Sequence, residues 1–204
     1  MKQLILASQS PRRSEILKKA GYQFASFPVY VSEIPNKNLS LDEQILDIAG
    51  RKAEAVLQQL KAGPSEIKDK VILTADTMVC YGDQALGKPD DEQMAVEFLR
   101  LLSGRRHQVK TALCLVDLST EEKLSHIETT DVFFKNLSDA EIRNYISTGE
   151  PMDKAGAYAI QGIGAKFVEK FEGDYDNVVG LPLHALEKLF KLRGWIFQKT
   201  LSGL

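Results

Sequence analysis

The chain has 204 residues, of which 44% are hydrophobic and 26% are charged, and its formal net charge is −2. This length can bury one sizeable core or two small lobes, and the balanced charge without a basic block excludes an extended interface with duplex nucleic acid. No apolar run reaches membrane-spanning length, and no signal sequence precedes the first strand pattern, so we expect a cytoplasmic protein that binds neither nucleic acid nor membranes.

The chain opens on an expected strand at residues 3–7, followed by an expected helix at residues 11–20. Ser10 suits the N-cap position, and the next residue is a proline, which fits the first helical position because no amide donor is lost there. The free amides and the positive dipole end of such a helix favour an anion. Arg12 and Arg13 oppose this dipole, so they are poorly placed for helix stability alone.

Two interpretations of this turn stay open. In the first, the hydroxyls of Ser8 and Ser10 and the guanidinium groups of Arg12 and Arg13 form a phosphate site around the free amides. In the second, the segment is a capped surface helix whose arginines extend into solvent.

Strand-like and helix-like segments alternate along the rest of the chain. Two of the helices begin with a capping box, formed by Ser40 with Glu43 and by Ser138 with Glu141. The expected strands cover residues 23–31, 71–81, 109–118, 123–134 and 166–171, and the expected helices cover residues 40–60, 90–102, 138–149 and 183–192. We therefore expect an α/β fold with a single domain over residues 1–204, in which a mixed sheet is flanked by helices in two lobes around a cleft.

Lys52 interrupts the apolar stripe of the expected helix at residues 40–60, four residues after Ile48 and four before Val56. A lysine at such a position commonly extends its ammonium group to water. The alternative is a lysine that reaches from a packed helix face into a cleft, where it would suit a phosphate.

Asp76 interrupts the apolar strand at residues 71–81, where a carboxylate is costly unless it is paired, hydrogen-bonded or bound to a metal. It is either a strand-end cap or a functional group at the floor of a cleft, as a metal ligand or a general base. Glu33, in a loop before Pro35, is ordinarily solvated, but with Asp76 it would complete an oxygen-ligand site for Mg²⁺. Thr77 is a good strand former whose hydroxyl can also reach a ligand.

Residues 82–89 have the glycine and lysine spacing of a P-loop, but Pro89 stands where a metal-binding serine or threonine is required. The proline also disfavours helical geometry at Lys88. We therefore exclude a P-loop, expect a tight hairpin turn at Gly82 and Asp83, and expect Lys88 to face the cleft just beyond it.

The glycine-dense segment at residues 156–164 allows a close approach of backbone to a ligand. Gln161 within it carries both a donor and acceptors and could read a base edge; the alternative is a plain turn. The three histidines lie in separate elements and show no triad. Cys80 and Cys114 lie in apolar runs without metal-ligand spacing, which is typical of buried free thiols in a reducing compartment.

Six stretches of the chain, in this order, resemble the Maf family of nucleoside triphosphate pyrophosphatases. They extend over nearly the whole chain, and six in one order form a specific signature. They are residues 6–13 (Leu-Ala-Ser-Gln-Ser-Pro-Arg-Arg), 75–77 (Ala-Asp-Thr), 86–89 (Leu-Gly-Lys-Pro), 103–111 (Ser-Gly-Arg-Arg-His-Gln-Val-Lys-Thr), 153–158 (Asp-Lys-Ala-Gly-Ala-Tyr) with Gln161 and Gly162, and 178–183 (Val-Val-Gly-Leu-Pro-Leu).

This resemblance implies hydrolysis of a nucleoside triphosphate to a monophosphate and pyrophosphate with a divalent cation, Mg²⁺ or Mn²⁺. It also implies an elongated α/β fold with a central cleft, as in the Maf and inosine triphosphatase proteins, and a homodimer. Ala159, where many relatives have glycine, is a mild departure that affects only the expected local backbone.

The resemblance also assigns roles to residues. By family analogy Asp76 is the proton acceptor, and the family's phosphate-contacting and acidic positions match Ser8, Arg13, Glu33, Lys52 and Lys88. Arg12, Thr77 and Gln161 match the positions that mark base selectivity, and this combination resembles the branch that acts on dTTP and UTP, with modified pyrimidine nucleotides as further candidates.

Two other functions stay open at this point. The family is also linked to septum formation in cell division, so the chain could be a nucleotide-binding regulator without essential turnover. It could also be a metal-dependent phosphatase that removes the γ-phosphate. The acid pair of Glu33 and Asp76 favours an enzyme, because a sensor needs no metal-activated water.

Overall fold

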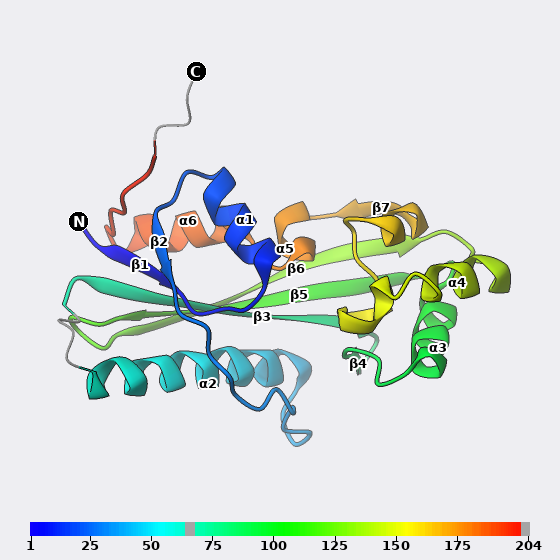
Figure 1. The fold of residues 1–204 in the computed structure, drawn as a ribbon, viewed down its shortest axis with the longest axis horizontal. Coiled ribbons are helices and arrows are strands. Elements are labelled where there is room, and N and C mark those ends of the chain that lie inside the picture. Colours follow the sequence, from blue (N-terminus) through cyan, green and yellow to red (C-terminus); the bar gives the residue numbers. More distant parts are fainter. Residues whose placement is uncertain (64–67, 201–204) are drawn as a thin grey trace. The chain divides into compact units, whose positions relative to one another are not determined.

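The computed structural model describes residues 1–63 and 68–200, and within them seven strands form one mixed sheet of order β2-β1-β3-β5-β6-β7, with β4 paired to β3 (Figure 1). The strands are β1 (Gln3–Leu6), β2 (Phe24–Ser26), β3 (Lys70–Tyr81), β4 (Gln84–Leu86), β5 (Arg106–Asp117), β6 (Lys123–Phe134) and β7 (Val168–Glu172). The α-helices are α1 (Pro11–Lys19), α2 (Leu41–Ala62), α3 (Glu92–Leu102), α4 (Asp139–Ile146), α5 (Tyr175–Val179) and α6 (Leu183–Leu192). The expected α/β class with a mixed sheet is confirmed.

Local sequence signals account for most of these elements. Both predicted capping boxes form, because Ser40 and Ser138 each accept a hydrogen bond from the backbone of the glutamate three residues later, and that glutamate's side chain accepts one in return. The two-residue hairpin turn at Gly82 and Asp83 also forms, since Tyr81 pairs with Gln84.

The predicted strand at residues 23–31 is wrong beyond its first part. β2 covers only Phe24–Ser26, because it pairs with β1 at Leu4, Ile5 and Leu6, where β1 ends. Pro28 follows and has no amide to donate to a neighbouring strand. The residues beyond β2 form the loop that carries Glu33.

The connection from β1 to β2 and the connection from β2 to β3 run in opposite directions across the sheet. β1 pairs in parallel with β2 on one side and with β3 on the other. Because crossovers between parallel strands are right-handed as a rule, α1 and α2 are expected on opposite faces of the sheet, and Figure 1 shows them there. Ligands of open α/β sheets bind at the carboxyl ends of the strands at such a switch, which here is the end of β1 beside β3.

The chain folds into two compact units. The first contains residues 1–76, 111–127 and those from 180 onward, and the second contains residues 77–110 and 128–179. Among the described residues, no helix is both long and apolar enough to cross a membrane.

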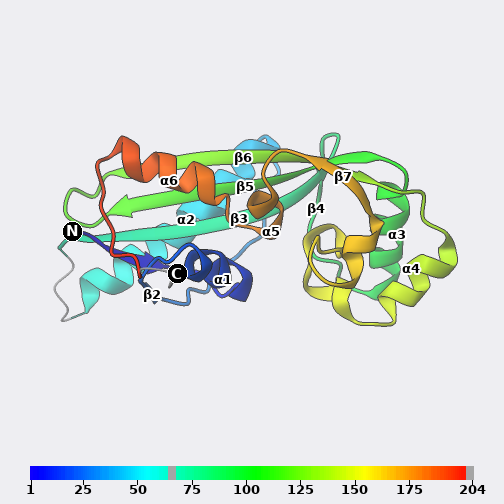
Figure 2. The same ribbon diagram turned by 90° about the horizontal axis from the view of Figure 1, so that it is seen from above.

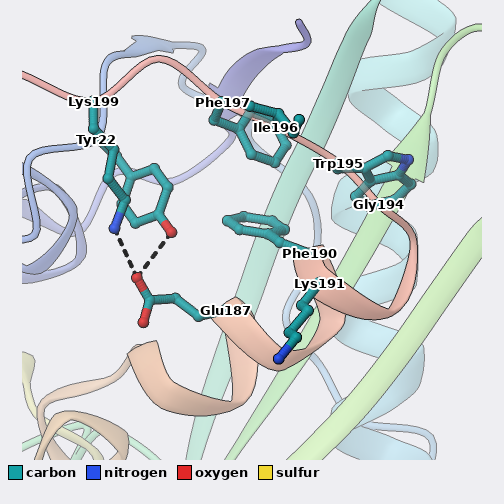
Figure 3. A pocket seen from close by; sticks show the side chains of 9 residues that line it. All are labelled: Tyr22, Glu187, Phe190, Lys191, Gly194, Trp195, Ile196, Phe197 and Lys199. Carbon is teal, nitrogen blue, oxygen red and sulfur yellow. Dashed lines mark hydrogen bonds and ion pairs between the residues drawn. The ribbon is translucent and has the colours of Figure 1, made fainter.

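In the first unit, the segment after α6, which Figure 2 shows crossing from α6 to β1 and β2, is attached by an aromatic and ionic cluster. Glu187 accepts hydrogen bonds from the hydroxyl of Tyr22 and from Lys199 Nζ, both at 2.9 Å (Figure 3). The rings of Phe190 and Phe197 lie 4.4 Å apart beside them, and a pocket of about 440 Å³ opens among these side chains. Because the polar groups of Tyr22, Glu187 and Lys199 bond to one another, we assign this cluster a structural role: it holds the segment after α6 against the rest of the first unit.

The second unit has its own hydrophobic core, to which α3, α4, β5 and β6 contribute and which includes Leu99, Tyr145 and Phe167. His107 is buried in this core, and its Nε2 shares a 2.7 Å hydrogen bond with the hydroxyl of Tyr158. Burial lowers the pKa of His107 to about 4. This histidine is therefore a neutral core residue.

Candidate functional site

The turn between β1 and α1 is organised by Ser8. Ser8 Oγ accepts a hydrogen bond from the amide of Ser10 at 3.1 Å and another from Arg13 Nη1 at 3.2 Å. Ser10 occupies the N-cap position as predicted, with proline at the first helical position, but its side chain makes no capping hydrogen bond. The predicted position of the N-cap is therefore correct, but the predicted capping hydrogen bond is absent. Ser8 fixes the turn instead, and the hydroxyl of Ser10 does not compete for the first amides of α1.

Arg13 is buried rather than solvated, which excludes the surface-helix interpretation for this residue. Its Nε donates a 2.8 Å hydrogen bond to the carbonyl of Gly180. Burial lowers the pKa of Arg13, while the negative charges of Asp76 and Glu33 act to raise it and the charge of Arg12 adds to the lowering. These electrostatic effects place both carboxylates and both arginines in one neighbourhood.

Lys52 does not extend to water. Its Nζ lies 2.6 Å from Asp76 Oδ1 and 2.6 Å from Glu33 Oε1, and its side chain is only 9% exposed. The two carboxylates differ in their surroundings, since the Asp76 side chain is 14% exposed and that of Glu33 is 52% exposed. A buried ammonium thus holds one strand carboxylate and one loop carboxylate together.

Strand and helix periodicity explain why these groups meet. Thr74 and Asp76 are two residues apart on β3 and so point to the same face of the sheet. The hydroxyl of Thr74 donates to the carbonyl of Ala49 on α2 at 2.8 Å, which shows that this face packs against α2. Lys52 is three residues after Ala49 and therefore shares its side of the helix.

The register of β1 and β3 places Asp76 at the switch point. Leu6 pairs with Leu73, and the amide of Ala7 donates to the carbonyl of Leu73 at 2.8 Å. Asp76 is three residues further along the parallel direction, so it lies beyond the end of β1, where the turn with Ser8 begins. The geometry thus combines an arginine-bearing helix start with two carboxylates and a lysine.

Such an arrangement has the charges that a polyphosphate and a divalent cation require. Guanidinium and ammonium groups bind phosphate oxygens, and carboxylate oxygens suit Mg²⁺ or Mn²⁺. Within the described residues no cluster of three or more metal-ligating side chains occurs. Glu33 and Asp76, which already converge on one cation, form the pair of oxygen ligands that the chain offers at this point.

The remaining predicted residues, Thr77, Lys88 and Gln161, belong to the second unit. Lys88 is exposed just after β4, and the carbonyl of the preceding Gly87 accepts a 3.0 Å hydrogen bond from the amide of Gly156. Gly156 has φ +67°, and a Cβ there would lie 2.8 Å from Val79 Cγ1, so only glycine permits this approach. The segment that carries Gln161 is thereby attached beside Lys88. Thr77 lies half-buried on β3.

A residue that the sequence did not single out positions the turn after Gln161. Glu150 accepts hydrogen bonds from the amides of Ile163 and Gly164, both at 3.0 Å. The hydroxyl of Tyr145 donates to the same carboxylate at 2.9 Å. Glu150 lies six residues before the glycine-dense segment at residues 156–164, so no sequence pattern marked it, and the carbonyl of Gly180 could not be found from side-chain chemistry.

The chain matches the family described as "Maf-like protein" over residues 3–192. It is 54% identical over 186 residues to the dTTP/UTP pyrophosphatase of Bdellovibrio bacteriovorus, which covers 91% of this chain and 96% of that protein. It is 43% identical over 199 residues to the dTTP/UTP pyrophosphatase of Caldicellulosiruptor bescii, which covers 98% of both chains. Among solved structures, the Ham1 protein of Staphylococcus aureus matches with a TM-score of 0.48 at 12% identity, over 94% of this chain and 100% of that one.

Proposed function

Because the chain belongs to the family of Maf-like proteins, we propose that it hydrolyses nucleoside triphosphates, chiefly dTTP and UTP, to the monophosphate and pyrophosphate. Relatives that carry the name dTTP/UTP pyrophosphatase align over nearly its full length. The observation that carries the proposal is the single ammonium of Lys52, which lies 2.6 Å from both Glu33 and Asp76. This ammonium joins Asp76 of β3 to Glu33 of the loop after β2. The pair lies near the carboxyl end of β1, where a phosphate chain would meet the start of α1.

In this proposal the cations bind the triphosphate. Arg13 is held in place by Ser8 and by the carbonyl of Gly180, so its orientation is fixed before a ligand arrives, which limits the entropy lost on binding. Arg12 lies in the same first turn of α1, two residues after the N-cap residue Ser10. Lys88 of the second unit is assigned to the triphosphate by the resemblance alone.

Glu33 and Asp76 fit a divalent cation. They come from different elements and already enclose a positive charge, and hard carboxylate oxygens are the ligands that Mg²⁺ and Mn²⁺ prefer. When bound there, such a cation would neutralise charge on the triphosphate and favour attack by water. Lys52, held by the same two carboxylates, would then offer its ammonium to the phosphates.

The reaction we propose is attack of water on the α-phosphorus. The bond from the α-phosphorus to the bridging oxygen breaks, pyrophosphate leaves, and the water oxygen remains on the monophosphate. Asp76 accepts the proton of the attacking water, and a positioned base of this kind typically contributes about 10²–10⁴-fold to the rate. The resemblance assigns Gln161, Thr77 and Arg12 to recognition of the pyrimidine, and the amide of Gln161 suits this role because it can match both the donors and the acceptors of a base edge.

The proposal extends to the setting of the protein. Cys80 and Cys114 are both buried and are joined by no disulfide, which supports a reducing cytoplasmic location. We also propose the homodimer that the resemblance implies; light scattering should give twice the mass of one chain, and a monomer would remove this part.

Analysis of the products formed from dTTP with Mg²⁺ tests the proposed function. We expect dTMP and pyrophosphate in equal amounts. Orthophosphate with dTDP would instead identify a phosphatase of the γ-phosphate, and binding of dTTP without any product would identify a nucleotide-binding regulator.

A further inference from the structure

The loop that carries Glu33 has little regular structure of its own. It connects β2 to α2 without a strand or helix, and Glu33 is among its exposed residues. Next to Glu33, the amide of Ile34 makes a 3.4 Å hydrogen bond to Ser32 Oγ. A side chain on such a loop does not stay on a buried lysine unless the backbone beside it is fixed.

Arg51 on α2 supplies that fixation. Its Nη1 donates to the carbonyl of Ser32, and its Nη2 donates to the carbonyl of Ile34 at 3.1 Å. These are the two carbonyls on either side of Glu33. The third nitrogen, Nε, donates to Asp47 Oδ2 one turn earlier on the helix at 3.0 Å, so the guanidinium is itself held in one orientation.

Two consecutive residues of α2, Arg51 and Lys52, therefore hold Glu33, one through the backbone and the other through the side chain. Arg51 binds the backbone on both sides of it, and Lys52 binds its carboxylate at 2.6 Å. A planar guanidinium can bridge two carbonyls at fixed spacing, whereas a lysine ammonium is a single point charge on a flexible stem. An ion pair with Asp47 alone would be an ordinary pair on the helix surface, worth a few tenths of a kcal/mol.

We propose that Arg51 is a positioning residue: it fixes the loop so that the Glu33 carboxylate stays beside Lys52 and Asp76, ready for the divalent cation. This inference rests on the proposed function for its effect on turnover, but not for its effect on the loop. Groups that orient a metal-binding side chain typically contribute about 10–100-fold to activity or metal affinity.

A double-mutant cycle tests whether Arg51 acts through Glu33. Arg51→Met should lower kcat for dTTP by about tenfold and raise the Mg²⁺ concentration needed for half-maximal rate. Glu33→Gln should lower kcat further, and the combined variant should equal Glu33→Gln alone, because Arg51 has nothing left to position. If the two losses instead multiply, Arg51 acts independently of Glu33 and the proposal is overturned.

The control variant is Lys61→Met, which removes a cation from the same helix. Lys61 pairs with Glu121 at 2.7 Å and lies ten residues, or about 15 Å, further along α2. It should leave kcat and the Mg²⁺ requirement unchanged. Arg51→Lys keeps the charge but cannot bond to both the Ser32 and the Ile34 carbonyl, so it should behave like Arg51→Met. Wild-type activity in Arg51→Lys would contradict the role of this double hydrogen bond.

Hydrogen exchange separates this proposal from the proposed function. Peptides that cover residues 30–36 should exchange faster in Arg51→Met than in the wild type or Lys61→Met. If the wild type releases no pyrophosphate from dTTP, the proposed function fails, while the exchange result still decides whether Arg51 holds the loop. Unchanged exchange in Arg51→Met would overturn the inference whatever the activity.

Discussion

Replacing Lys52 with methionine removes the charge that joins the two carboxylates. Each carboxylate oxygen lies 2.6 Å from Nζ, so the two oxygens are at most about 5 Å apart. At an effective dielectric of about 20 they repel by about 3 kcal/mol, which the ammonium offsets and a methionine leaves uncompensated. Because the Glu33 side chain is 52% exposed, water screens roughly half of this. Loss of the charged partner of Asp76 adds about 1–2 kcal/mol, and the methionine regains about 1 kcal/mol through apolar contact. We expect a net loss of about 2 kcal/mol at neutral pH.

Urea unfolding followed by the fluorescence of Trp195, the single tryptophan, measures this loss within the first unit. Lys61→Met is the matched control; its ion pair is solvent-exposed, so its stability should stay within about 0.5 kcal/mol of the wild type. Adding Mg²⁺ should restore part of the stability of Lys52→Met, because a divalent cation can replace the ammonium between the carboxylates. Equal stability of the Lys52 and Lys61 variants would refute the reasoning.

Three other variants probe the remaining groups. Asp76→Asn keeps an acceptor for Lys52 and should fold, as circular dichroism would verify, but lose at least about 10²-fold in kcat; a wild-type rate would remove Asp76 from the reaction. Gln161→Glu puts a carboxylate in place of an amide donor and should lower selectivity for dTTP and UTP over purine triphosphates in competition assays; an unchanged profile would remove Gln161 from base readout. His107 has a folded-state pKa of about 4, so its contribution of about 3 kcal/mol is complete above pH 6.5 and is lost as pH falls toward 4; urea titrations should show a shallower decline for His107→Gln, and identical declines would contradict this.

Much of the fold could be predicted because its signals are local. The helix at residues 183–192 has the bounds that the apolar period indicates, and Ser40 and Glu43 mark a helix start through contacts three residues apart. The errors fall where pairing with distant residues decides. β2 is short because β1 offers few partners, and the five-residue α5 was not predicted because so short a helix depends on tertiary packing.

The site was predictable in its members but not in its contacts. Asp76 and Lys52 were conspicuous because each interrupts an apolar pattern at a cost in free energy. Their partnership joins residues 24 positions apart, and only the placement of α2 on the face of Thr74 brings them together. Ser10 looked like the cap because its type and position suit that role, yet Ser8 makes the contacts, since the backbone path of the turn decides which hydroxyl reaches.

Hydrolysis of dTTP in H₂¹⁸O by the wild type, Asp76→Asn and Asp117→Asn tests the central claim most directly. Asp117 is an acid paired with Lys2 at 2.8 Å, outside the proposed site. Mass spectrometry should find the label in dTMP and none in pyrophosphate, with Asp117→Asn like the wild type and Asp76→Asn nearly inactive. Label in pyrophosphate, or labelled dTMP formed at the wild-type rate by Asp76→Asn, would contradict the account.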